Sequence, residues 1–409
     1  MKKVQVVCIT IVALLVAMPL VINTASANPS SRWDSLKTYM DNHYDDPVAK
    51  NGEGGFTTTG SIVSMLYPTV GAVMVYQEEN MLSNRPPVFD LVAAKNFTQK
   101  LQWKSGGESY DRWGGFSLYV AGPVSIKNSY WAIQMWETLD QQTGIPNIES
   151  VKSINATSAL IYVNKTQSES GGFGATGGAA PDLLSTFYAL SVMNAMTDMA
   201  QVPLDNWLWN ETTTVNWILS CRDGDAFKLS PDSDTPSVSA TAAAFLALNE
   251  IQKLTVLTPT DQQAIENWML ARQIITPISD EYVGGFTESV LTNDTNLEST
   301  YFALQFLNLI ADGIDSVNAS AAADFILNCQ AADGAWGLTP GTSTGSLFYA
   351  ALALQSLKVL DPTNDTYMNM LNQEDPNNLA PPPVDWRLLF VALFIVAALV
   401  IALVALRLD

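Results

Sequence analysis

The stretch FILNCQAADGAWGL, from Phe325 to Leu338, joins an apolar helix end to a turn that contains a glutamine, a glycine and a tryptophan. Related glycine-containing turns that end in an aromatic residue recur along the chain. A repeat of 50 to 60 residues has room for two helices and their loops, so the sequence predicts an array of six helix pairs. The aromatic residues of the six turns are Phe56, Phe116, Phe173, Phe227, Phe286 and Trp336.

Each turn lies between two different helical patterns. The segment before the turn, as in NASAAADFILNCQ at residues 318–330, has apolar residues at helical spacing beside polar ones. The segment after it, as in LSTFYALSVMNAM at residues 184–196, is apolar on nearly every side and predicts a buried helix. Six exposed and six buried helices fit a closed double ring, because an open array would leave its end faces uncovered. The predicted fold class is all-α, an α6/α6 toroid.

At these turns the chain resembles the α/α toroids of protein prenyltransferase β subunits and squalene-hopene-type terpenoid cyclases. The resemblance implies the toroid fold over roughly residues 30–372. We predict that the motif glutamine has a structural role and satisfies backbone groups at helix ends. The superfamily's repeat, Q-x-x-x-G-x-W/F, is matched by Gln330, Gly334 and Trp336, and by Gln167, Gly171 and Phe173.

The two ends of the chain predict export and a membrane anchor. Lys2 and Lys3 precede an apolar run, and the small residues 25–27 provide the cleavage site of a signal peptide. The 19 residues from Leu388 to Leu406 are all apolar, which is enough to cross a bilayer. We therefore expect a single-pass membrane protein with its toroid outside the cell. The expected segments are a signal peptide at 1–27, the toroid at 28–372, a Pro-rich linker at 373–385 and a transmembrane anchor at 386–407.

The net charge argues against nucleic acid as a partner, and the glycosylation sequons agree with export. Twenty Lys and Arg residues against 40 Asp and Glu residues give a net charge of −20, which repels nucleic acid. The sequence carries no signal of an oligomeric state. Seven Asn-X-Ser/Thr sequons agree with an exported glycoprotein; they are at Asn96, Asn155, Asn164, Asn210, Asn293, Asn318 and Asn364.

The resemblance also predicts where a zinc site would lie. Protein prenyltransferases bind zinc through an Asp, a Cys and a His, and the register of the buried helices places Leu297, Ser299 and Ser346 at those positions. None of these is a useful zinc ligand. The single histidine, His43, is expected at the surface. The prediction is therefore no metal site and no cofactor.

Terpenoid cyclases instead protonate an alkene with the middle Asp of a D-x-D-D motif. The nearest stretch here is Asp232-Ser233-Asp234-Thr235, which lacks the final Asp and precedes a buried helix. Asp232 and Asp234 are the candidate catalytic acids. The alternative interpretation is a turn with a capping carboxylate.

The buried segments carry aromatic pairs in the same register, and these predict an aromatic-lined cavity. Such a cavity suits an apolar or isoprenoid ligand, although the rings could simply fill the core. In the fourth unit the pair is Ala242-Ala243, so we expect the cavity to be deepest there, beneath the Asp232 loop. The candidate ligand-binding residues are Tyr130, Phe187, Ala242, Tyr301 and Phe348.

Three hypotheses for function remain open. The preferred one is a binding protein that holds an apolar small molecule, lipid or peptide without zinc. The second is an enzyme of the cyclase or prenyltransferase type that uses Asp232 or Asp234. The third is a structural module of the cell surface. In the first repeat, where the ring closes against the sixth, Pro68 is expected to break or kink the buried helix.

Overall fold

The computed structural model describes residues 30–47, 52–78, 89–142, 151, 153–276, 280–310 and 312–377. Residues 32–373 form one compact unit, and the residues on either side belong to a second unit. The predicted signal peptide and transmembrane segment lie outside the described residues. Within the described ranges, no helix is both long and apolar enough to span a bilayer.

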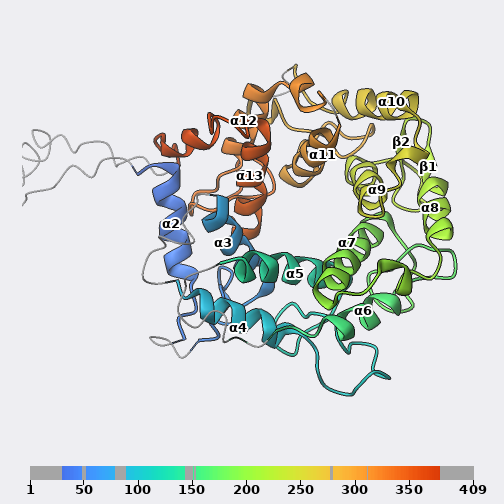
Figure 1. The fold of residues 1–409 in the computed structure, drawn as a ribbon. Coiled ribbons are helices and arrows are strands. Elements are labelled where there is room, and N and C mark those ends of the chain that lie inside the picture. The colour runs from blue at the N-terminus through green and yellow to red at the C-terminus, as the bar shows by residue number, and fades with distance from the viewer. Residues whose placement is uncertain are drawn as a thin grey trace, which may run out of the picture. The chain divides into compact units, whose positions relative to one another are not determined.

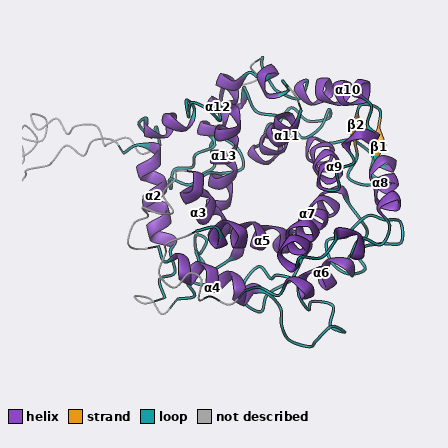
Figure 2. Ribbon diagram, in the orientation of Figure 1, coloured by secondary structure: helices purple, strands orange, loops and turns teal. Residues whose placement is uncertain are grey.

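The described part of residues 32–373 folds into twelve α-helices in two concentric layers (Figures 1 and 2). The chain alternates between the layers, one outer helix and one inner helix in each repeat. The outer helices are α2 (Arg32–His43), α4 (Leu91–Leu101), α6 (Ala156–Asn164), α8 (Glu211–Ser220), α10 (Pro259–Leu270) and α12 (Ala319–Asn328). The inner helices are α3 (Leu66–Glu78), α5 (Ile126–Asp140), α7 (Leu183–Ala200), α9 (Val238–Glu250), α11 (Leu297–Leu309) and α13 (Leu347–Leu360).

Short elements connect these helices. Two-residue strands β1 (Arg222–Asp223) and β2 (Ala226–Phe227) pair in the turn of the fourth repeat. In the other five repeats, a single antiparallel bridge joins the turn aromatic to a residue near the end of the outer helix, as Gln273 to Phe286. The 3-10 helices are η3 (Leu204–Asn206), η4 (Leu254–Val256), η5 (Asp280–Tyr282), η6 (Ile314–Ser316) and η7 (Met368–Asn372).

The helices begin at the residues that the sequence marks with caps. Five inner helices follow Ser125, Asp182, Ser237, Asn296 or Ser346, and each of these side chains accepts a hydrogen bond from a backbone N–H in the first turn. Such caps stabilise a helix start because the first N–H groups have no partner within the helix.

The inner layer closes into a ring at α3 and α13. Each inner helix contacts the next, and α13 packs along α3 to complete the circle. The two helices lie close together at Gly71, where a Cβ atom would lie 2.2 Å from the Leu347 carbonyl. Pro68 does not break α3, contrary to the expectation, because it lies in the first helical turn, where a backbone N–H has no acceptor in the helix.

The outer layer closes through Arg32 of α2. This buried arginine donates from Nη1 to the Leu327 carbonyl at 2.8 Å and to Oε1 of Gln330 at 3.0 Å. Gln330 donates in return from Nε2 to the Arg32 carbonyl at 3.0 Å. The end of α12 is therefore tied to the start of α2.

Glutamines tie each of four turns to the next outer helix. Gln273 donates from Nε2 to the carbonyls of Gly284, at 3.0 Å, and Asn318, at 3.1 Å. Its Oε1 accepts from the Asn318 N–H at 3.0 Å, and Asn318 is the N-cap of α12. The predicted structural role of the motif glutamine is thus confirmed. Equivalent contacts are made by Gln102, Gln167 and Gln330.

Candidate functional site

A cavity of about 60 Å³ lies among the inner helices. Its walls come from α5, α7, α9 and α11, and six of its eight lining side chains are aromatic. The rings come from the aromatic pairs of the inner helices. They meet in the cavity because these pairs occupy the same helical turn in several repeats. The lining residues are Tyr130, Trp131, Phe187, Tyr188, Leu246, Tyr301, Phe302 and Gln305.

The rings that line the cavity also touch one another. The ring of Tyr130 lies 4.8 Å from that of Tyr188 and 5.4 Å from that of Phe187, between centroids. Phe348 of α13 lies outside the lining, but its ring contacts those of Trp131, at 5.0 Å, and Tyr67, at 5.1 Å. Ring packing therefore fills much of the centre and leaves a small cavity.

Three of the five candidate ligand-binding residues, Tyr130, Phe187 and Tyr301, line this cavity. Both members of the aromatic pairs Tyr130-Trp131, Phe187-Tyr188 and Tyr301-Phe302 line it. Ala242 is fully buried and is not among the lining residues. Instead, α9 contributes Leu246, which lies four residues further along the same helix face. The expectation that the cavity is deepest at Ala242 is therefore not met.

Four polar side chains of the lining have no hydrogen-bonding partner among the described residues. The hydroxyls of Tyr130, Tyr188 and Tyr301 make no hydrogen bond with any described residue, and neither does the Gln305 amide. Burial raises the pKa of all three tyrosines above the usual range, with further contributions from nearby acidic groups. The cavity thus offers hydroxyl and amide groups to a ligand inside an aromatic wall.

An ion pair crosses the ring beside the cavity. Lys127 of α5 and Glu298 of α11 lie near the starts of their helices, with Nζ and Oε1 3.6 Å apart. These helices are not neighbours in the inner ring, so the pair spans its opening. Lys127 also lies 5.8 Å from the Tyr67 ring centroid and 6.0 Å from that of Phe348, which suits a cation on aromatic faces.

Carboxylates lie toward the other ends of the inner helices. Glu250 of α9 accepts from the Ser191 hydroxyl at 2.6 Å and from the Asn194 amide at 2.7 Å, which ties α9 to α7. Glu137 of α5 is half-buried, and burial raises the pKa of its carboxyl, as do the acidic neighbours Asp198 and Glu250.

The candidate acids Asp232 and Asp234 are both exposed, in the loop between β2 and α9, and neither lines the cavity. A carboxyl group in water lacks the apolar surroundings that raise the pKa of a catalytic acid. At the positions that correspond to zinc ligands, Ser299 donates to Glu288 at 2.6 Å, Ser346 caps α13 and Leu297 is buried. Among the described residues, no group of three His, Cys, Asp or Glu side chains is placed to hold a metal ion.

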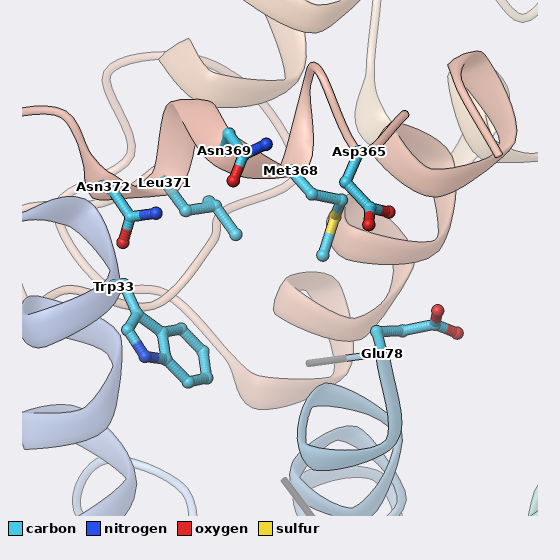
Figure 3. Close-up of a pocket in the computed structure, with 7 residues that line it drawn as sticks. All are labelled: Trp33, Glu78, Asp365, Met368, Asn369, Leu371 and Asn372. Carbon is cyan, nitrogen blue, oxygen red and sulfur yellow. The ribbon is translucent and has the colours of Figure 1, made fainter. Parts of the chain in front are cut away.

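A second, larger cavity of about 150 Å³ lies between α2, the end of α3 and η7 (Figure 3). Trp33, Met368 and Leu371 form its buried part. The polar residues of its lining are Glu78, Asp365, Asn369 and Asn372. Three of these four are exposed to solvent, so it is an open surface cleft at the seam of the ring.

Sequence comparison finds one family. A family model described as "Prenyltransferase alpha-alpha toroid domain" matches residues 128–208 and 203–379. Among curated proteins, none has a significantly similar sequence.

Solved structures with a similar fold come from several kinds of protein. Protein geranylgeranyltransferase-I of Candida albicans, complexed with GGPP, has a TM-score of 0.57 at 16% identity, over 76% of this chain and 91% of that one. The GH76 α-mannanase of Bacteroides thetaiotaomicron has a TM-score of 0.54 at 13% identity, over 84% and 96%. The cellobiose 2-epimerase of Spirochaeta thermophila has a TM-score of 0.51 at 14% identity, over 81% and 94%. At these identities the likeness concerns the fold alone.

Proposed function

The chain belongs to the prenyltransferase alpha-alpha toroid domain family, and on that premise we propose that it is a binding protein that holds the apolar part of a small ligand in its central cavity. The observation that carries this proposal is the cavity itself, with six aromatic side chains and three tyrosine hydroxyls that have no partner in the described protein. Ligand sites are typically apolar clefts with a few converging polar groups, and this cavity has that composition.

The size of the cavity limits the ligand. Its volume of about 60 Å³ is well below the roughly 300–1,000 Å³ of most ligand pockets. The Candida protein of similar fold is complexed with GGPP, and an isoprenoid is one ligand class for this chain. A lipid or peptide is the alternative. In each case, only a small group or a chain end would enter the cavity unless the rings move.

Binding is preferred to catalysis because of what surrounds the cavity. The exposed side chains of Asp232 and Asp234 do not line it, and Leu297, Ser299 and Ser346 cannot hold a zinc ion. The proposal therefore needs no zinc and assigns no acid catalyst.

Native mass spectrometry of the chain, purified without added ligand, tests the proposal. We expect a reproducible extra mass that disappears on organic extraction. Leu246→Trp fills the cavity and should abolish this mass, whereas Leu309→Trp, at a position on α11 that is 39% exposed and does not line the cavity, should retain it. A bare mass for the unaltered chain would count against ligand binding.

A surface-interaction module is the second candidate function, favoured by exposed apolar side chains on loops. Ile62 is 93% exposed and Leu291 is 75% exposed. Each lies in the loop that leads from a turn aromatic to an inner helix. Their sequence neighbours Val63 and Val290 are also exposed, and exposed apolar residues that lie together are typical of surfaces that contact another molecule.

We also propose that the toroid stands outside the cell on a C-terminal membrane anchor. The support is sequence alone: the signal-peptide pattern at residues 1–27 and the apolar run Leu388–Leu406. Protease treatment of intact cells should digest the toroid, and removal of residues 386–407 should release it into the medium. A toroid that is protected in intact cells would contradict this placement.

A further inference from the structure

The inner helices all run in the same direction. The backbone N–H that begins α3 donates to the Leu118 carbonyl, in the loop that leads into α5, at 2.8 Å. The same contact recurs between neighbouring repeats, where the N–H groups of Ile126, Leu183, Val238 and Leu297 donate to the carbonyls of Ala175, Leu229, Glu288 and Leu338. The starts of the inner helices therefore gather at one end of the ring, and their carboxyl ends gather at the other.

The carboxyl ends of these helices form a negative zone that basic residues offset only in part, since Lys95 of the outer helix α4 pairs with Asp140 at the end of α5. Each helix end carries a partial negative charge, which basic residues in the last turn normally offset. The last turns of α3, α5, α7, α9 and α11 contain no basic residue. In α13 the last turn has Lys358, which pairs with Asp365.

Acidic side chains add to this zone. Glu137 and Glu250 lie in or near the last turns of α5 and α9, where a negative charge opposes the helix dipole. Neither carboxylate lines the cavity, but Glu250 lies one helical turn beyond Leu246 of its wall, and Glu137 lies two turns beyond Tyr130. Burial raises the pKa of the Tyr130 hydroxyl, and these two carboxylates contribute to the same shift. Acidic residues at the carboxyl ends of helices lower helix stability. Features that lower stability are expected at functional sites, so these carboxylates near the cavity indicate a role in binding.

The cavity wall favours positive charge for a separate reason. The face of an aromatic ring is electrically negative and attracts an organic cation. Six aromatic side chains line the cavity, and oxygens of three tyrosines are free to accept hydrogen bonds there. The inner helices contain two basic residues: Lys127 lies toward the opposite ends of the helices and is paired with Glu298, and Lys358 is paired with Asp365.

We propose that the ligand of the central cavity carries an ammonium group, which the aromatic wall and the carboxylates of Glu137 and Glu250 recognise together. This inference rests on the proposed function, since it names the charge of the ligand that the cavity holds. An organic cation fits better than a metal ion, because no group of three metal-ligating side chains occurs among the described residues. Moreover, ring faces take the place of oxygen ligands in the wall.

The test compares two probes of the same shape. Choline carries a trimethylammonium group, and 3,3-dimethylbutan-1-ol carries an uncharged tert-butyl group in its place. Isothermal titration calorimetry on the full chain should show choline binding at least about tenfold more tightly, since the field of the carboxylates adds to the ring attraction. Glu137→Gln and Glu250→Gln should each weaken choline by about three- to tenfold and leave the alcohol unchanged.

Asp324→Asn is the matched control, because it removes one charge from an exposed position on outer helix α12 and should alter neither affinity. Glu250 also ties α7 to α9, so Glu137→Gln provides an independent result if the other variant unfolds. Equal binding of choline and the alcohol would overturn the inference and leave the proposed function standing. Unchanged choline affinity in both glutamine variants would also overturn it, and binding of neither probe would count against both proposals.

Discussion

At the scale of single residues, the turn glutamines hold neighbouring repeats together. Gln273 is buried and makes three hydrogen bonds to the backbone of Gly284 and Asn318. Gln273→Ala leaves these backbone groups without that partner. We expect the free energy of unfolding to fall by about 2–3 kcal/mol, because unsatisfied buried polar groups cost about 1–3 kcal/mol each. Urea denaturation followed by circular dichroism measures this loss.

The control is Gln263→Ala, at an exposed position of α10 in the same repeat. Its effect should lie within about 0.5 kcal/mol, as for most surface substitutions. Equal effects at Gln273 and Gln263 would show that the turn glutamine adds no stability.

The two cysteines in the described residues provide a second prediction at this scale. Cys221 and Cys329 are free and buried. Burial raises the pKa of Cys221 to about 12 and also raises the pKa of Cys329. Because only the thiolate reacts, we expect neither to react with 5,5′-dithiobis(2-nitrobenzoate) in the native chain at pH 8, and both to react in guanidinium. A Cys8→Ser background removes the third thiol, and fast reaction of a native thiol would refute the prediction.

At the scale of elements, the contact between α3 and α13 depends on the absence of a side chain at Gly71. Gly71→Ala would normally favour a helix by about 1 kcal/mol. Here the new Cβ would lie 2.2 Å from the Leu347 carbonyl and 2.6 Å from the Phe348 nitrogen, so the helices must separate. We expect a net loss of about 1–3 kcal/mol, measured by thermal unfolding.

Gly177→Ala is the comparison for this change, since a Cβ there meets nothing closer than 3.6 Å. Its melting temperature should stay near that of the unaltered chain. A stabilised Gly71→Ala variant would mean that α3 and α13 do not approach as closely as described.

The same scale shows how far the sequence could predict the fold. The buried and amphipathic segments predicted the helix pairs because hydrophobic periodicity is local. Gln102 and Gln273 were missed because they stand 14 and 13 positions before Phe116 and Phe286, whereas Gln167 stands six positions before Phe173. An insertion of loop residues hides the motif, although the hydrogen bonds are the same.

The site was less predictable than the fold. Aromatic pairs identified the wall, but which helix turn faces the cavity depends on how each helix is rotated in the ring. The structure selects Leu246 rather than Ala242 on α9, and it adds Gln305, one turn beyond Tyr301. Following the helical period from Tyr301 would have indicated Gln305, since both lie on the same face.

At the scale of the whole molecule, the ring should unfold as one unit. Closure gives every repeat two neighbours, so no repeat is free to fray as the end of an open array does. Arg32→Ala removes the hydrogen bonds to Leu327 and Gln330 that join the first outer helix to the last. We expect a loss of about 2–4 kcal/mol, because a buried carbonyl and amide lose a charged donor.

Tryptophan fluorescence and circular dichroism should report the same denaturation midpoint for the unaltered chain. In Arg32→Ala, both midpoints should shift down together. Lys37→Ala, which affects an exposed ion pair on the same helix, should shift neither. Separate midpoints in the unaltered chain would mean that the repeats unfold independently.

The seam also determines where the backbone of the toroid could be cut. The Arg32 N–H donates to the Gln373 carbonyl at 3.0 Å, so the first and last residues of the ring are already adjacent. In a closed ring of similar repeats, the chain could begin with any repeat. Linking residue 373 to residue 32 and opening the chain between two other repeats should therefore yield a circular permutant with the same ring and the same cavity.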